Sequence, residues 1–271
     1  MKKSRQVWVA AALAGVALIA GAFLAFRGRE VGSGSGDALL GMRPAVGNGF
    51  AVVELFTSEG CSSCPPADAL VAAVQKADKD LPVYILSFHV DYWDRLGWKD
   101  AFSDAAYSDR QKDYARWLHL SSIYTPQVIV NGQTEFVGSD AGALYKAIDN
   151  GLAGTPAGKL SLEGVKLSGG RLSWQAHGEA NGGGNGLRII VAAVEHDATT
   201  KVMAGENHGK TLSHVQIVRS YKVASLNAKG DASGQLAWPE GITASGGELI
   251  AFIQDTGNGK IVAATRSAIG G

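Results

Sequence analysis

The alternation of strand-like and helix-like segments between residues 50 and 152 constrains the fold more than any other feature. FAVVELFT, residues 50–57, and LPVYILSFHV, residues 81–90, are continuous apolar runs of the kind that form buried strands. QVIVNGQTEFVG, residues 127–138, predicts a hairpin because its central NG dipeptide is a strong two-residue turn signal. Apolar residues near helical spacing predict helices in three segments, 66–78, 100–119 and 139–152. The order β-α-β-α-β-β-α predicts a mainly parallel sheet with helices on both faces.

A different pattern follows Pro156. Short strand-like segments alternate with turn sequences such as SGG, NGGGNG and TGNG. We predict strands at residues 159–167, 171–179, 187–196, 214–225, 235–239, 248–255 and 260–266. Many short strands at this spacing are typical of an antiparallel sandwich. The predicted fold class is therefore an α/β domain at residues 49–155, followed by an all-β antiparallel sandwich-like domain at residues 156–271.

The first 26 residues have the pattern of a targeting segment. Three basic residues within the first five positions precede residues 7–26, which carry no charge and as a helix would reach ~30 Å, the thickness of a hydrocarbon core. The small residues at 20–22 also fit the cleavage site of a signal peptide. We favour a single-pass membrane anchor, with the body on the periplasmic or extracytoplasmic side, over a cleaved signal that gives a secreted protein. Residues 27–48 are expected to form a flexible linker.

The chain has only two cysteines, Cys61 and Cys64, and they lie between the first predicted strand and the first predicted helix. One interpretation is a stabilising disulfide, although closing so short a loop contributes only roughly 2 kcal/mol. A second is a metal site, which needs more ligands than one cysteine pair and would have to recruit histidines such as His89. The third is a redox-active dithiol, because the two-residue spacer keeps a resolving thiol beside an attacking thiolate.

The position of the cysteine pair favours the redox-active dithiol. A helix N-terminus stabilises an anion, so a cysteine beside it can lose its proton near neutral pH. Pro65 and Pro66 follow the pair, and proline suits the first helical position while disfavouring helical geometry in the residue before it. We therefore expect the helix to begin near Pro66, with Cys61 as the attacking thiol and Cys64 as the resolving thiol.

The element order, with a CxxC sequence after the first strand, resembles the thioredoxin fold over about residues 50–152. The resemblance implies an α/β thioredoxin-like domain with a cis-proline at Thr125-Pro126, immediately before the strand QVIV. In that position the backbone of Thr125 would pair with a bound substrate beside the dithiol. An ordinary trans proline at the start of an edge strand is the alternative.

Four segments carry a closer resemblance: VVELFTSEGCSSCPPADAL, HVDYWD, IYTPQVIVNG and GENHGKTLSHVQIVRS. They are similar to a bacterial secreted or membrane-anchored thioredoxin-like family of unknown function, and the similarity spans both expected domains. The spacer Ser62-Ser63 departs from the Gly-Pro of thioredoxins. Whether the dithiol oxidises, reduces or isomerises its partners is therefore open.

Polar residues on the predicted strands suggest further site residues. Glu54 lies mid-strand among apolar residues, where a buried carboxylate beneath the dithiol can accept a proton, unless it faces solvent at the strand's edge. His89 and Asp91 follow the second strand, at the sheet end where open α/β sheets bind ligands, so His89 either contacts substrate or forms a structural pair. In the second half Glu206, His208, His214 and Arg219 either meet at a ligand site, brace the domain interface or form a polar loop.

These observations predict extracytoplasmic thiol–disulfide exchange with Cys61, Cys64, Glu54, Thr125, Pro126 and His89 as the site residues. No organic cofactor is needed, and the partners would be protein thiols or disulfides and a redox partner. The equal numbers of basic and acidic residues, 25 each, give no reason to expect nucleic acid. Two alternatives stay open: a membrane-tethered copper metallochaperone that uses both thiolates and His89, and a binding module with an inert disulfide.

Overall fold

The first half of the protein follows the predicted element order in the computed structural model, which describes residues 47–180 and 186–270. Its elements are β1 (Ala51–Thr57), α2 (Pro65–Ala77), β2 (Val83–His89), the 3-10 helix η1 (Asp91–Leu96), α3 (Ala105–Trp117), β3 (Gln127–Val130), β4 (Thr134–Val137) and α4 (Ala141–Ala153). The predicted order β-α-β-α-β-β-α is confirmed. The predicted starts of α2 and α4 hold for local reasons: proline occupies the first positions of α2, and the Asp140 side chain caps α4 by accepting from the Ala143 amide. Helix α3 begins at Ala105, five residues after the predicted start, where the Asp104 side chain caps it by accepting from the Ala106 amide.

The second half contains the predicted strands. They are β5 (Gly158–Ser168), β6 (Arg171–Ala180), β7 (Leu187–Lys201), β8 (Thr211–Ala224), β9 (Asp231–Ala237), β10 (Gly247–Asp255) and β11 (Ile261–Ala268), with the 3-10 helix η2 (Ala244–Gly246) before β10. Their boundaries differ from the predicted ones mostly at the strand ends, where β7 and β8 extend into a long antiparallel hairpin.

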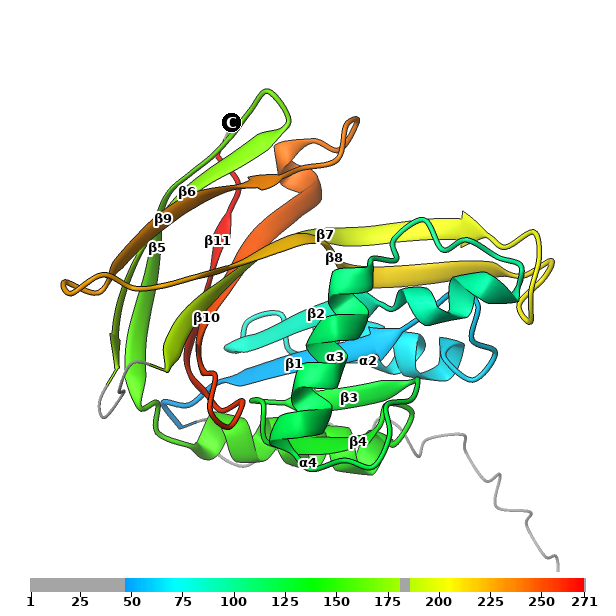
Figure 1. Cartoon of the computed structure of the whole chain (residues 1–271), viewed down its shortest axis with the longest axis horizontal. Helices are drawn as coiled ribbons and strands as arrows, with labels where there is room; N and C mark the ends of the chain where they lie inside the picture. Colours follow the sequence, from blue (N-terminus) through cyan, green and yellow to red (C-terminus); the bar gives the residue numbers. More distant parts are fainter. Residues whose placement is uncertain (1–46, 181–185, 271) are drawn as a thin grey trace, which may run out of the picture. The chain divides into compact units, whose positions relative to one another are not determined.

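The strands assemble into two sheets (Figure 1). The larger is a mixed eight-stranded sheet in the order β11-β10-β7-β8-β2-β1-β3-β4, and the smaller has the order β5-β6-β9. The junction within the large sheet is the parallel pairing of β8 with β2, where Ser87 lies opposite Ile217. The Ser87 hydroxyl also donates a hydrogen bond to the carbonyl oxygen of Val215 at 2.8 Å. Strands from both halves of the chain therefore share one sheet.

The predicted fold class is wrong. We expected an α/β thioredoxin-like domain followed by a separate antiparallel sandwich, and instead four strands of the second half extend the sheet of the first. All described residues fall within one compact unit, Arg43–Gly271. The sequence patterns identified the strands correctly, but strand pairing depends on contacts between distant segments, which local periodicity does not encode.

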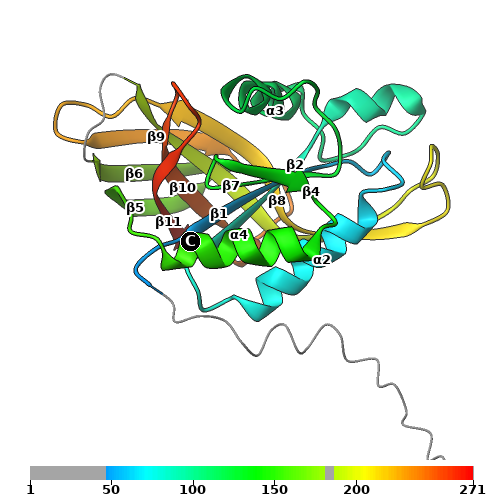
Figure 2. The same cartoon turned by 90° about the horizontal axis from the view of Figure 1, so that it is seen from below.

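Helix α3 lies on one face of the large sheet, and α2 and α4 lie on the other (Figure 2). Beneath α3, one apolar cluster takes side chains from both halves of the chain: Val52, Phe56, Phe88, Tyr107 and Tyr114 pack with Ile190, Val194, Ile250 and Phe252. Because burying apolar surface stabilises by about 25 cal/mol per Å², this shared core ties the two halves together.

The opposite face of the large sheet is covered in two parts. Helices α2 and α4 cover its β1–β3 region through a cluster that includes Val53, Leu55, Val71 and Ile148. The β5-β6-β9 sheet covers the region of β7 and β10, where Trp174 and Leu172 pack with Val191 and Leu249. The second half is thus partly a sheet-on-sheet structure, but one of its two sheets is continuous with the first half.

No helix among the described residues is long and apolar enough to cross a membrane. The expected anchor or signal at residues 1–26, and the expected linker at residues 27–48 as far as residue 46, lie outside the described residues.

Candidate functional site

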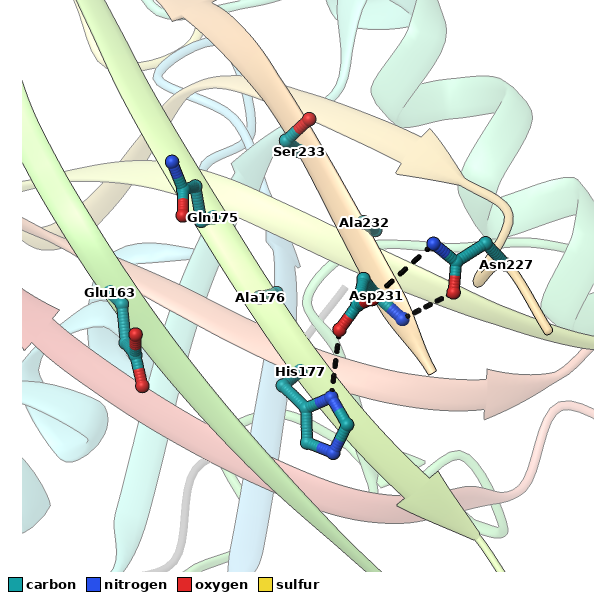
Figure 3. A pocket seen from close by; sticks show the side chains of 8 residues that line it. All are labelled: Glu163, Gln175, Ala176, His177, Asn227, Asp231, Ala232 and Ser233. Atoms are coloured by element: carbon teal, nitrogen blue, oxygen red, sulfur yellow. Dashed lines mark hydrogen bonds and ion pairs between the residues drawn. The ribbon is translucent and has the colours of Figure 1, made fainter. Parts of the chain in front are cut away.

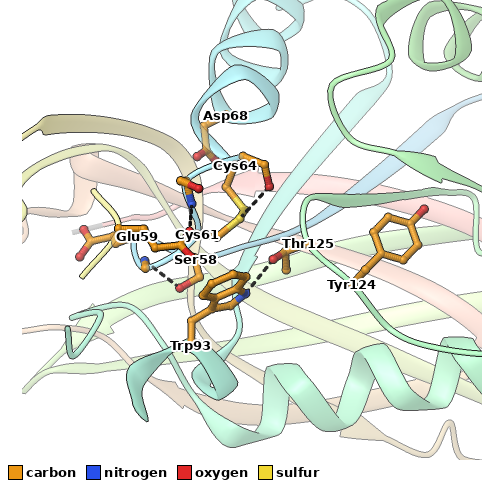
Figure 4. Close-up of a disulfide and its surroundings, with 12 residues drawn as sticks. Ser58, Glu59, Cys61, Cys64, Asp68, Trp93, Tyr124 and Thr125 are labelled. Carbon is orange, nitrogen blue, oxygen red and sulfur yellow. Dashed lines mark hydrogen bonds between the residues drawn. A yellow bond between two sulfur atoms is a disulfide. The ribbon is translucent and has the colours of Figure 1, made fainter. Parts of the chain in front are cut away.

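Cys61 and Cys64 form a disulfide at the start of α2, with their Cα atoms 5.4 Å apart (Figure 4). Cys64 is the N-cap residue of the helix, and its carbonyl oxygen accepts hydrogen bonds from the amides of Ala67 and Asp68. The Ser63 hydroxyl donates to the sulfur of Cys61 at 3.4 Å. Both cysteines have 0% exposed surface, whereas the two spacer serines are exposed. The pair is therefore an oxidised disulfide whose sulfur atoms are covered.

Trp93 connects the loop before Cys61 to the Thr125-Pro126 peptide. Its indole N–H donates to the Thr125 hydroxyl at 2.8 Å, and a Cβ atom built on Gly60 would lie 3.1 Å from the Cβ of Trp93. The Thr125-Pro126 peptide bond is cis, which confirms that expectation. Figure 4 shows Trp93 and Thr125 on the same side of the disulfide. Trp93 thus positions Thr125 near the CxxC loop.

Five buried titratable side chains gather at the inner side of the disulfide loop. Three are carboxylates and two are imidazoles: Glu59, Asp68, Asp100, His89 and His214, all at most 5% exposed. Glu59 lies in the loop before Cys61, Asp68 in the first turn of α2, and Asp100 in the segment after η1. His89 lies at the end of β2, and His214 comes from β8 of the second half. Burying ionisable groups is costly unless they are paired, so such a cluster marks a candidate functional site. We call these five residues the acid–base cluster.

His89 and Asp100 are the tightest pair of the cluster. The Nδ1 atom of His89 lies 2.8 Å from Oδ2 of Asp100, and the same carboxylate oxygen accepts from the Glu59 amide at 2.9 Å. Burial lowers the pKa of His89, but the adjacent Asp100 carboxylate, together with Asp68 and Glu59, more than offsets this effect, so the pKa is raised above its ordinary value. Burial alone would raise the pKa of Asp100. His89 and two backbone amides outweigh that effect, so the pKa of Asp100 lies below its ordinary value. Both shifts favour the charged forms of the pair, an imidazolium and a carboxylate.

His214 brings the second half of the chain into the cluster. Its Nε2 lies 3.4 Å from Oε1 of Glu59, its Nδ1 lies 4.0 Å from Oδ2 of Asp68, and neither nitrogen has a hydrogen-bond partner among the described residues. The ring packs edge to face on His89, with centroids 4.8 Å apart. The other oxygen of Glu59 accepts from the Trp98 indole at 2.7 Å. His214 thus lies between two buried acids.

Asp68 links the cluster to the disulfide. It is four residues after Cys64 on the same helix, which places both on one helical face, and Figure 4 shows it beside Cys64. Burial raises the pKa of its carboxyl group, and the neighbouring His214 and His89 offset only part of that rise. Asp68 is therefore a buried acid with a raised pKa, one helical turn after the cysteine that would resolve a mixed disulfide.

Glu54 does not lie with the cysteines. Its carboxylate accepts from Nε of Arg110 at 2.5 Å and from Nη2 at 2.8 Å, and it also accepts from the Tyr114 hydroxyl. All three residues are buried in the core beneath α3. Of the two alternatives for Glu54, the buried acid is the one observed, and its contacts are those of a structural ion pair.

The second-half stretch at residues 205–220 contributes to the site in part. His214 joins the acid–base cluster, and the Glu206 carboxylate accepts from the Ser62 amide at 3.0 Å. Arg219 instead pairs with Glu195 at 2.6 Å and stacks over Phe102, while the His208 residue is exposed. Of the alternatives for this stretch, the contacts of Glu206 and His214 match a brace between the two halves.

Four residues at the site were not predicted from the sequence: Glu59, Asp68, Asp100 and Asn207, whose side chain donates to the carbonyl oxygens of Glu59 and Cys61. Glu59 and Asp68 had an available signal, since they flank the CxxC sequence by two and four residues and the latter spacing is helical. Asp100 and Asn207 carry no such signal, because only the tertiary fold brings their segments to the disulfide loop.

The described residues contain no group of three or more histidine, cysteine, aspartate or glutamate side chains arranged to hold a metal ion. The metallochaperone alternative would use Cys61, Cys64 and His89 as metal ligands. In this structure Cys61 is bonded to Cys64, and His89 is paired with Asp100 through Nδ1.

A separate pocket of about 490 Å³ lies on the three-stranded sheet (Figure 3). In it His177 Nδ1 lies 2.8 Å from Oδ1 of Asp231, and the Asn227 side chain accepts from the Asp231 amide. The hydrogen bond to Asp231 raises the pKa of His177. Both members of the pair are about half exposed, so we interpret it as a paired surface histidine.

Comparisons with known proteins agree on a family and not on an activity. A crystal structure of protein AGR_C_4864 from Agrobacterium tumefaciens is 30% identical, covers 82% of this chain and 94% of its own, and has a TM-score of 0.59. HBP35 of Porphyromonas gingivalis is 15% identical, covers 82% of this chain and 76% of its own with a TM-score of 0.56, and at that identity the likeness concerns the fold alone. No curated protein matches the chain. A family described as "Protein of unknown function (DUF1223)" matches residues 52–254, and the chain therefore belongs to that family.

Proposed function

We propose that this protein is an extracytoplasmic thiol–disulfide oxidoreductase that uses the Cys61–Cys64 disulfide. The observation that carries the proposal is the acid–base cluster beside the disulfide, with Asp68 one helical turn after Cys64. A purely structural disulfide needs no buried acid, since it neither gains nor loses protons. Disulfide exchange does, because each thiolate that leaves must be stabilised or protonated.

The exchange begins when a substrate thiolate attacks the sulfur of Cys61. The Cys61–Cys64 bond breaks, a mixed disulfide forms between the substrate and Cys61, and Cys64 leaves as a thiolate at the N-terminus of α2. The protonated carboxyl of Asp68 donates its proton to that thiolate, and the cluster histidines stabilise the resulting carboxylate. The remaining steps, release of the oxidised substrate and reoxidation of the two cysteines, are ordinary thiol–disulfide exchange.

A second substrate thiolate attacks the substrate sulfur of the mixed disulfide. The substrate leaves with a disulfide, Cys61 leaves as a thiolate, and two electrons have moved from the substrate dithiol to this protein. A disulfide-bearing redox partner then reoxidises the cysteines. The same steps run in reverse if the partner is a reductant, so the partner's potential sets the direction.

We place the substrate beside the disulfide, at the Thr125-Pro126 peptide. In our proposal the Thr125 backbone pairs with the substrate chain, and Trp93 keeps Thr125 in position. His89 acts within the acid–base cluster rather than in direct contact with substrate, because its ring is fully buried. The N-terminal segment of residues 1–26 supports the location outside the cytoplasm.

The complete burial of both sulfurs favours a second candidate, a binding module with an inert structural disulfide. A trapping experiment separates the two. Cys64→Ser should leave extracytoplasmic proteins covalently joined to Cys61 through a reducible bond, and the Cys61→Ser/Cys64→Ser double variant is the matched control. Equal capture by both variants, together with a reduction potential below about −300 mV, would establish the structural disulfide instead.

A further inference from the structure

The turn between β7 and β8, residues 202–210, holds the backbone of the CxxC loop through Asn207. The side-chain Nδ2 of Asn207 donates to the carbonyl oxygens of both Glu59 and Cys61, each at 2.9 Å. Asn207 is fully buried and lies 146 residues from Cys61 in the chain. A single amide group from the second half thus satisfies two carbonyl oxygens of the loop, those of Glu59 and Cys61.

Further hydrogen bonds within the turn fix the position of the Asn207 side chain. The Lys210 ammonium donates to Oδ1 of Asn207 at 2.9 Å, so the opposite end of the side chain is also held. Backbone hydrogen bonds from Lys210 to Asn207 and from Gly209 to Val202 close the turn. Next to it the exposed Glu206 accepts from the Ser62 amide at 3.0 Å, inside the CxxC loop itself. Two neighbouring side chains therefore hold two consecutive loop residues, Cys61 and Ser62.

We propose that Asn207 is a positioning residue that keeps the disulfide closed to solvent, and that exchange requires its release. The proposal rests on the proposed function and names the regulation of that site. Both sulfurs have no exposed surface in the held state, whereas an incoming thiolate must reach Cys61 along the S–S axis. The residues that hold the loop include Glu206 and Lys210, which are exposed on the surface. A partner that binds this turn can therefore release the loop.

Reduction by the phosphine TCEP tests the proposal, because a phosphine must touch a sulfur atom but needs no protein partner. Asn207→Ala removes both hydrogen bonds to the loop, and His208→Ala is the matched control on an exposed neighbour in the same turn. We expect the reduction rate of Asn207→Ala to rise about tenfold, equivalent to about 1.4 kcal/mol, while that of His208→Ala changes less than about twofold.

A merely structural role would predict a different signature. If Asn207→Ala only destabilised the whole fold, the sulfurs would be reached through global unfolding, and the reduction rate would rise steeply with urea. Local release of the loop gives a reduction rate that is nearly independent of urea below the unfolding transition. A faster rate without urea dependence supports the proposal, and an unchanged rate or a steep urea dependence overturns it.

If Asn207→Ala does not fold, the double variant Glu206→Ala/Lys210→Ala carries the same test. Both residues are exposed; Glu206 binds the Ser62 amide of the loop, and Lys210 holds the Asn207 side chain. A rate increase of at least about threefold is expected, and no increase overturns the proposal. The outcome is independent of the trapping experiment. Faster TCEP reduction without substrate capture would support the role of Asn207 in closing the site and refute the oxidoreductase function. Substrate capture with an unchanged reduction rate would support the oxidoreductase function and refute the role of Asn207.

Discussion

Arg110 binds both carboxylate oxygens of Glu54 in the core of the protein, with Nε 2.5 Å from Oε2 and Nη2 2.8 Å from Oε1. Arg110 also donates to the side-chain oxygen of Gln254 at 3.2 Å, and Gln254 donates to the Tyr114 hydroxyl at 2.8 Å. These contacts join β1 and α3 of the first half to β10 of the second. The same buried pair therefore helps to explain why both halves share one sheet.

Replacing Glu54 with Gln should destabilise the protein by about 3–5 kcal/mol, because it leaves the buried Arg110 charge without its partner. Urea denaturation measures the change in the free energy of unfolding. Asp113→Asn is the control, since its pair with Arg116 is on the surface and is expected to contribute about 0–1 kcal/mol. A loss below about 1 kcal/mol for Glu54→Gln would contradict the role of the ion pair. The TCEP reduction rate of Glu54→Gln in the absence of denaturant should equal that of the wild type if Glu54 has no part in the thiol chemistry.

The acid–base cluster should make the protein most stable at mildly acidic pH. The folded-state pKa of His89 is raised above 6.5, so its stabilising contribution is complete below pH 6.5 and is lost as the pH rises through the folded value. The pKa of Asp100 is lowered below 3.8, so its contribution is present above pH 3.8 and is lost as the pH falls through the folded value. Chemical denaturation between pH 3 and pH 9 should show both losses, and His89→Gln should remove the alkaline one. A wild-type profile that rises steadily through neutral pH would contradict this account.

Asp68→Asn should stabilise the protein more at neutral pH than at acidic pH. The folded-state pKa of Asp68 is raised above 3.8, so the folded protein holds a proton that the unfolded chain releases, and stability falls as the pH rises above 3.8. Asparagine keeps the shape of the protonated acid and removes that dependence. The difference in unfolding free energy between Asp68→Asn and the wild type, measured in urea, should therefore grow from pH 4 to pH 7. Asp80→Asn, at an exposed position near the end of α2, is the control and should show a smaller change.

Gly132→Ala should be far more harmful than Gly241→Ala. Both glycines have positive φ, +69° and +82°, so both substitutions carry a backbone penalty of about 1–2 kcal/mol. A Cβ at Gly132 would also lie 1.8 Å from the carbonyl oxygen of Gly259, whereas a Cβ at Gly241 meets no atom within 4 Å. We expect the Gly132 variant to lose at least about 2 kcal/mol more in urea denaturation. Equal losses for the two would show that the contact between this turn and the β10–β11 loop is not tight.

The pKa of His177 should fall toward its ordinary value of 6.5 in Asp231→Asn, because the hydrogen bond to the Asp231 carboxylate is the main cause of its elevation. NMR titration of the His177 ring protons measures the pKa directly. Glu179→Gln is the control, since Glu179 lies 3.8 Å from the other ring nitrogen and ranks below Asp231 among the causes. A larger drop in the Glu179 variant would contradict the assignment of Asp231 as the principal partner.

Local features of this fold were predictable from the sequence because their causes are local. The apolar runs predicted β1 and β2, the NG dipeptide predicted the β3–β4 turn, and the proline pair predicted the start of α2. The CxxC spacing allows the disulfide, and the cis peptide at Thr125-Pro126 followed from a resemblance to known proteins. Each of these depends on residues within a few positions of one another.

The partners of distant residues were not predictable in this way. The apolar residues around Glu54 on β1 suggested a buried carboxylate, but nothing near it in the chain identifies Arg110 as its partner. The polar residues at 205–220 stood out in the sequence, yet the contacts of His214 with Glu59, and of Asn207 with Cys61, depend on where β7 and β8 join the sheet.

The sequence by itself determined the helices, the strands, the disulfide loop and the apolar face of each element. Secondary-structure propensity and hydrophobic periodicity depend only on residues a few positions apart in the chain. Only the tertiary structure decided that β8 pairs with β2, and with that pairing the second half supplies a buried histidine and an asparagine to the disulfide site. The physical reason is that strand pairing and the burial of charged groups depend on the free energy of the whole assembled core, to which residues far apart in the chain contribute together.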